Sequence, residues 1–172
     1  MHATVIQIVL ATSLCSLVGC KSMHGESRWR TRDEGTFTVE IPSWWHKRKV
    51  QPIDSHCGEY VSLRVRFNFD EVDELLYRTD KAKARHDELA RAYQASVQDE
   101  ASPQFIRRIG DRFALFTVEQ DQKWEDGGYP GKHAVEVFIP YERGGSLNLW
   151  ITFRDLSDRE TALRIAKSIQ SK

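Results

Sequence analysis

The stretch that decides the expected fold is His133–Arg154, HAVEVFIPYERGGSLNLWITFR. Two segments in which apolar and polar residues alternate, His133–Tyr141 and Ser146–Arg154, flank the sequence Glu142–Gly145. Such alternation on both sides of a short turn that contains two glycines is typical of a β-hairpin, whose strands run antiparallel. The sequence therefore predicts an antiparallel sheet built around this hairpin.

More strands are predicted on the N-terminal side of the hairpin. Strand-like alternation occurs over Thr36–Ile41, Tyr60–Phe69, Phe105–Ile109 and Arg112–Gln120. We expect Tyr60–Phe69 to be one continuous strand in which the odd-numbered side chains, Leu63 included, share the apolar face. With the hairpin, these segments give a sheet of about six strands.

Two helices complete the predicted α+β domain. From Asp70 to Ser102 the apolar residues recur at helical spacing without Gly or Pro, which predicts one long helix, or two with a break near Thr79. Ser157 and Glu160 have the spacing of a capping box, which opens a C-terminal helix. The order is β-β-α-β-β-β-β-α, a mainly antiparallel sheet with a long central helix and a C-terminal helix packed on it.

The first 20 residues differ from the rest of the chain, because they contain none of its 25 basic or 25 acidic residues. The apolar run Val5–Val18 is shorter than the ~20 residues of a membrane-spanning helix, and its length is typical of a secretory leader. An ordinary leader that happens to contain a cysteine remains an alternative at this point.

The run ends in Leu17-Val18-Gly19-Cys20, which resembles the lipobox of bacterial lipoproteins. In that family the cysteine is lipidated and the leader is cut just before it. The resemblance implies a signal peptide over residues 1–19, a lipidated Cys20 with a polar linker over 20–34, and one α+β domain over 35–172. It places the protein on a membrane of the bacterial cell envelope, at the periplasmic or extracellular face. Lys21 after the cysteine favours the outer membrane.

Two stretches resemble the PsbP/Mog-like superfamily: FTVEIPSWW (Phe37–Trp45), and SLNLWITFRD with the later ETALRIAKSI (Ser146–Ile169). Members have an antiparallel sheet between helices and mostly serve as binding or accessory subunits. The resemblance implies a binding role and carries over no metal or cofactor residue.

No enzyme class is indicated by the motifs. The chain has no Gly-rich phosphate loop, no Ser nucleophile elbow and no H-E-x-x-H pattern. His56 and Cys57 are adjacent, so on a strand they would point to opposite faces, and we interpret Cys57 as a structural thiol. With Cys15 in the leader and Cys20 lipidated, Cys57 has no partner for an internal disulfide. A site built from His56, Cys57 and the distant His133 stays open, but we expect no metal and no cofactor. Because the formal net charge is zero, we expect no nucleic-acid partner.

The most suggestive candidate site is the basic and aromatic segment Trp44, Trp45, His46, Lys47, Arg48 and Lys49. Two adjacent tryptophans of an extended segment cannot easily both enter the core, so one is expected inside and one partly exposed. Aromatic residues beside arginine are typical of interface hot spots. The alternative is a solvated loop with one tryptophan closing the end of the fold. A second basic group, Arg64, Arg66, Arg107 and Arg108, is expected either to be ion-paired beneath a helix or to form a basic surface for an acidic partner.

Together these features predict a membrane-anchored, non-enzymatic binding or accessory module for another envelope protein, which it contacts through Trp44–Lys49. The alternative is a lipoprotein that binds a small ligand or a metal in a pocket between sheet and helix.

Overall fold

The computed structural model describes residues 28–50, 55–72, 79–96, 98–119 and 132–172. These contain a large antiparallel sheet of seven strands, in the spatial order β3 (His46–Arg48), β4 (His56–Val61), β5 (Val65–Val72), β9 (Ser146–Phe153), β8 (His133–Pro140), β7 (Arg112–Glu119) and β6 (Gln104–Ile109). A small antiparallel sheet has the order β1 (Trp29–Asp33), β2 (Phe37–Pro42) and β10 (Gln170–Ser171). The helices are α1 (Thr79–Ala95) and α2 (Arg159–Lys167), and α2 follows a 3₁₀ turn, η1 (Leu156–Asp158). The α+β class is confirmed, whereas the expected single sheet of about six strands is wrong, since the described residues form ten strands in two sheets.

The predicted hairpin is confirmed. Pro140 pairs with Ser146, and the Tyr141 backbone N–H donates to the carbonyl of Gly145 at 3.1 Å. Gly144 and Gly145 have φ angles of 103° and 82°, a region that side-chain-bearing residues seldom adopt. The two glycines therefore set the turn that pairs β8 with β9.

The expected continuous strand over Tyr60–Phe69 is instead a second hairpin. Val61 pairs with Arg66, and Ser62 closes the turn, since its hydroxyl accepts the Val65 N–H at 2.9 Å. Leu63 lies at the tip of this turn and is 97% exposed. A tight turn can keep the same alternation of apolar and polar residues on both sides, so periodicity alone does not reveal it.

The helices also differ from the sequence prediction. Residues Asp70 to Val72 extend β5, so α1 is shorter than the predicted Asp70–Ser102 helix, and residues 73–78 lie outside the described part. The capping box is wrong, because Ser157 belongs to the 3₁₀ turn and the N-cap residue Asp158 makes no side-chain cap hydrogen bond. In the described residues no helix is long and apolar enough to span a membrane.

Five residues of the expected linker form a strand. Trp29–Asp33, which we expected in the linker over 20–34, forms β1 and pairs along β2. The guanidinium of Arg164 lies 3.9 Å from the centre of the Trp29 ring, so this strand is held to α2 as well as to β2. The folded domain therefore includes residues that we expected in the linker.

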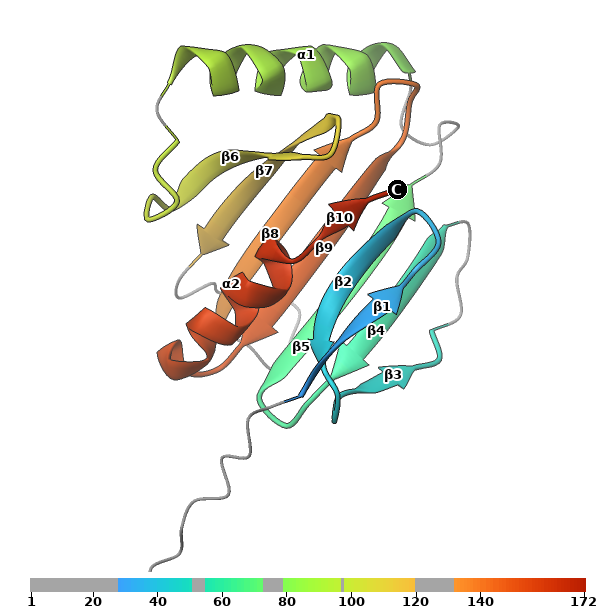
Figure 1. Ribbon diagram of the computed structural model, residues 1–172, viewed down its shortest axis with the longest axis vertical. Helices are drawn as coiled ribbons and strands as arrows, with labels where there is room; N and C mark the ends of the chain where they lie inside the picture. The colour runs from blue at the N-terminus through green and yellow to red at the C-terminus, as the bar shows by residue number, and fades with distance from the viewer. Residues whose placement is uncertain (1–27, 51–54, 73–78, 97, 120–131) are drawn as a thin grey trace, which may run out of the picture.

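The core lies between the large sheet on one side and the small sheet with α2 on the other. Figure 1 shows α2 and the small sheet over one face of the large sheet. Fully buried side chains of β5, β8 and β9 line this core, among them Phe67, Val135 and Ile151. On the opposite face, α1 covers β6, β7 and β8, where the rings of His86 and Tyr93 contact that of Phe113. We call the face toward α2 the inner face and the other the outer face.

Candidate functional site

The turn between β2 and β3 separates the two adjacent tryptophans as expected. The Trp45 backbone N–H donates to the Pro42 carbonyl at 3.0 Å, which closes a tight turn at the end of β2. Trp45 is 3% exposed and lies in the core, whereas Trp44 is 55% exposed. The two rings pack edge to face, with their centroids 6.1 Å apart. The buried ring therefore fixes the position of the exposed one.

Strand β3 then divides the basic side chains between the two faces of the sheet. His46 and Arg48 pair with Val61 and Glu59 and lie on the outer face. Lys47 points to the inner face, where its Nζ lies 2.5 Å from Oε2 of Glu34.

The outer face at this edge of the sheet is hollowed. A pocket of about 430 Å³, here called the basic groove, lies between the start of β3 and the β4–β5 turn; its lining residues are Trp44, His46, Arg48, Val61, Ser62, Leu63, Arg64, Val65 and Arg66. Three of the six predicted site residues, Trp44, His46 and Arg48, line this groove, while Trp45 and Lys47 turn inward. Lys49 is exposed and lies outside the lining.

The carboxylate of Glu59 lies close to two arginines of the basic groove. Oε1 of Glu59 lies 3.0 Å from Nε of Arg66, and its Oε2 lies 3.6 Å from Nη1 of Arg48. Arg64 and His46 add to the basic side, so the groove carries more positive than negative groups. Its lining thus combines a half-exposed indole, an aliphatic tip and arginines, a composition suited to an acidic partner with an apolar group.

The second basic group of the sequence prediction is split. Arg64 and Arg66 join the basic groove, whereas Arg107 and Arg108 lie on β6, at the opposite edge of the large sheet. Arg107 donates to the Lys167 carbonyl and Arg108 to the Gly110 carbonyl, each at 2.9 Å. The expectation of one shared surface for all four arginines is wrong, because three strands, β9, β8 and β7, separate β6 from β5 in the large sheet.

A buried acid holds the inner side of β3 in place. Glu34 is 4% exposed, and its carboxylate accepts hydrogen bonds from the Lys47 ammonium and from the Tyr60 hydroxyl. Burial, and then the neighbouring Glu34 carboxylate, raise the pKa of Tyr60, so its hydroxyl stays protonated and donates to Glu34 even at a pH at which a free tyrosine ionises. This cluster joins the β1–β2 turn to β3 and β4, the two strands that carry His46, Arg48 and Val61 of the groove lining. Sequence analysis placed Glu34 in the linker and missed it.

The candidate thiol and metal groups are dispersed. His56 Nδ1 lies 3.2 Å from Oε2 of Glu71, while the adjacent Cys57 is a free cysteine on the outer face. His133 neighbours Phe153, which pairs with Val65 at the start of β5, whereas His56 pairs with Glu71 near its end. His56 and His133 therefore lie toward opposite ends of the sheet. Within the described ranges no three His, Cys, Asp or Glu residues gather as metal ligands would.

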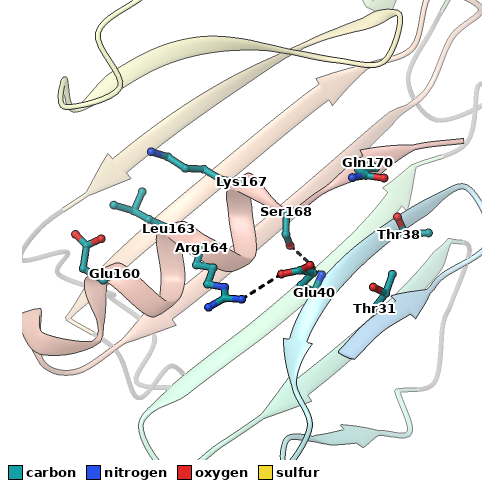
Figure 2. Close-up of a pocket in the computed structure, with 9 residues that line it drawn as sticks. All are labelled: Thr31, Thr38, Glu40, Glu160, Leu163, Arg164, Lys167, Ser168 and Gln170. Carbon is teal, nitrogen blue, oxygen red and sulfur yellow. Dashed lines mark hydrogen bonds and ion pairs between the residues drawn. The ribbon is translucent and has the colours of Figure 1, made fainter. Parts of the chain in front are cut away.

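A second pocket, of about 470 Å³, lies between the small sheet and α2 (Figure 2); it is lined by Thr31, Thr38, Glu40, Glu160, Leu163, Arg164, Lys167, Ser168 and Gln170. The Glu40 backbone N–H donates to the Ser168 hydroxyl at 2.8 Å, and the Glu40 carboxylate lies 3.5 Å from Arg164. Lys167 Nζ lies 2.6 Å from Oε2 of Glu100. Because these cations already have acidic neighbours, the pocket is polar but close to charge-balanced.

Comparison of the chain with protein-family models and with curated proteins finds no match.

Proposed function

We propose that this protein is a lipid-anchored, non-enzymatic binding module of the bacterial envelope that holds another envelope protein in the basic groove. The observation that carries the proposal is the exposed Trp44 ring, fixed by the buried Trp45 beside arginines that face the same groove. A rigid aromatic side chain loses little conformational freedom on binding, which is why such residues anchor interfaces.

The anchor is proposed from the LVGC sequence, residues 17–20. Cells that express the full chain and take up an alkyne fatty acid should yield a labelled protein, and Cys20→Ser should lose the label. Cys57→Ser is the matched control, since it removes a thiol of the folded domain and should leave labelling unchanged. A Cys20→Ser protein that still carries label, or a wild type that carries none, would refute the anchor.

The partner is expected to present a carboxylate next to an apolar side chain. The carboxylate would lie beside Arg48 and Arg64, whose exposed side chains line the groove. The apolar side chain would cover Trp44, which is half in water in the free protein. Such a contact removes apolar surface from water and adds charge-assisted hydrogen bonds.

Trp44→Ala should weaken capture of the partner about thirtyfold, since truncating a hot-spot tryptophan costs about 2 kcal/mol. The measurement is quantitative mass spectrometry of proteins cross-linked to the anchored protein in intact envelopes, followed by titration of the recovered partner. Arg48→Ala should weaken the same contact, and Val50→Ala is the control, an exposed apolar residue outside the groove lining. Trp45 and Lys47 are unsuitable for this test because both support the fold. Equal recovery with Trp44→Ala and Val50→Ala would rule out the groove.

A second candidate function is the binding of a small polar ligand in the pocket of Figure 2. Its position between a sheet and a helix favours this alternative, and the hydroxyl and amide groups of Thr31, Thr38 and Gln170 supply hydrogen-bonding partners. An uncharged ligand such as a saccharide suits the charge-balanced lining better than an ion. Saturable binding of a saccharide that Thr38→Val abolishes, with an unchanged cross-linking pattern, would favour this function over the first.

A further inference from the structure

We infer that the end of the domain at which β1 begins rests on an anionic lipid surface, with Leu63 and Leu156 at the level of the head groups. The inference rests on the proposed lipid anchor and adds an orientation to it. The surface in question, called here the lipid-facing end, comprises Arg28, Leu63, Arg64, Arg154 and Leu156, with Trp44 at its margin.

Arg28, the first described residue, lies at the same end of the domain as the β4–β5 turn. The Ser43 backbone N–H donates to the Arg28 carbonyl at 2.7 Å, so Arg28 lies beside the residue that precedes Trp44. His46, shortly after, pairs with Val61 at the β4–β5 turn. Figure 1 shows the start of β1 at the same end of the molecule as this turn. Arg28 and the β4–β5 turn that carries Leu63 therefore lie close to each other.

The length of chain before β1 limits the distance from the membrane. Cys20 and Arg28 are eight residues apart in the sequence (28 − 20). Even fully extended, eight residues span at most about 28 Å, less than the length of many small domains. An anchor at Cys20 therefore holds Arg28 within about 28 Å of the bilayer surface, so this end of the domain can reach the head groups.

Exposed apolar side chains gather at the same end. Among the described residues the large hydrophobic side chains that remain exposed are Leu63 (97%), Trp44 (55%), Leu156 (55%) and Val50 (38%). Val65 pairs with Phe153, so the β4–β5 turn with Leu63 and the η1 turn with Leu156 both lie just beyond this pair. Single exposed leucines are ordinary, but these protrude from adjacent turns beside the chain entry. Tryptophan beside them is typical of the interfacial region of a bilayer.

The charges of the lipid-facing end favour an anionic surface. Arg28, Arg64 and Arg154 are exposed there, against the acidic Asp155 and Asp158. Each arginine close to an anionic membrane changes attachment about fivefold. Leu63 and Arg64 also line the basic groove, so in this orientation one wall of the groove meets the head groups and the partner proposed above would be bound at the membrane surface, against Arg48 and Trp44.

The test uses the full lipidated chain in vesicles of phosphatidylethanolamine and phosphatidylglycerol. With Cys57→Ser as background, single cysteines replace Leu63, Leu156, Val50 or Lys83, and each carries a nitroxide label. Accessibility is measured to oxygen, which concentrates in lipid, and to a water-soluble nickel chelate. Val50 and the α1 residue Lys83 are exposed and serve as controls. Val50 follows β3, which runs from His46 beside the β4–β5 turn to Arg48 opposite Glu59, and Lys83 lies on the helix that covers the outer face.

Labels at Leu63 and Leu156 should be accessible to oxygen and shielded from nickel, and labels at Val50 and Lys83 should show the reverse. Nickel accessibility at Leu63 and Leu156 equal to that at Lys83 would overturn the orientation. Shielding from both reagents would also overturn it, because it indicates contact with a second copy of the protein. A protein that carries fatty acid but has water-exposed labels refutes only this inference, whereas a protein without fatty acid refutes the anchor itself.

Discussion

Lys47→Met should lower the free energy of unfolding by about 3 kcal/mol, a large effect for a side chain that is half exposed, because it leaves the buried Glu34 carboxylate without its cation. Water reaches the lysine side of the pair, so we expect the low end of the range for a broken buried ion pair. The Tyr60 hydroxyl would remain as a hydrogen-bond donor to Glu34. The methionine keeps most of the apolar stem of lysine, so the change isolates the charge.

Urea denaturation followed by tryptophan fluorescence measures this loss. Lys49→Met is the matched control, since Lys49 is exposed on the same segment, and a surface substitution of this kind stays within about 0.5 kcal/mol. In the double variant Glu34→Gln with Lys47→Met, no charge is left buried, and much of the stability should return. A Lys47→Met protein as stable as Lys49→Met would show that the cluster does not hold β3 to the small sheet.

The Glu34 cluster also shows why sequence analysis found only part of the candidate site. The alternation of β2 and the two glycines before β9 are local signals, and both elements were predicted. Glu34 reaches Lys47 and Tyr60 only after the small sheet has packed on the large one, and no local pattern records that contact. A charged residue in a polar stretch is normally solvent-exposed, which is why the segment was assigned to a linker.

The basic groove, too, could be predicted only in part from the sequence. One exposed and one buried tryptophan could be predicted, because adjacent residues of an extended segment face opposite ways. That Leu63 and Arg64 line the groove could not be predicted, because it depends on a turn at Ser62 that interrupts the predicted strand. Ser62 is the one residue between Val61 and Val65 that favours a turn, and serine is also compatible with a strand. A short turn inside an alternating pattern therefore accounts for much of the part of the groove that the sequence did not predict.

Gly58→Ala should destabilise the domain by about 3 kcal/mol, because a methyl group at this position would lie 2.4 Å from the Phe69 ring. Gly58 pairs with Phe69 across β4 and β5, and the ring covers the glycine backbone. Phe69 is 2% exposed, and its ring packs edge to face on that of Phe37 with centroids 5.2 Å apart, so it has little room to move. The backbone of Gly58 does not lie in the left-handed region, so the expected loss is steric and not conformational.

A double-mutant cycle separates this contact from a general effect on the strand. Phe69→Leu alone should cost stability through the cavity that it leaves, and Gly58→Ala should cost less in that background, because the methyl group then enters the vacated space. The loss of unfolding free energy in the double variant, measured by thermal and urea unfolding, should therefore be clearly smaller than the sum of the losses in the two single variants. If the two losses of stability were simply additive, the alanine would act on strand β4 itself. The Phe69 ring would then not be the reason for a glycine at position 58.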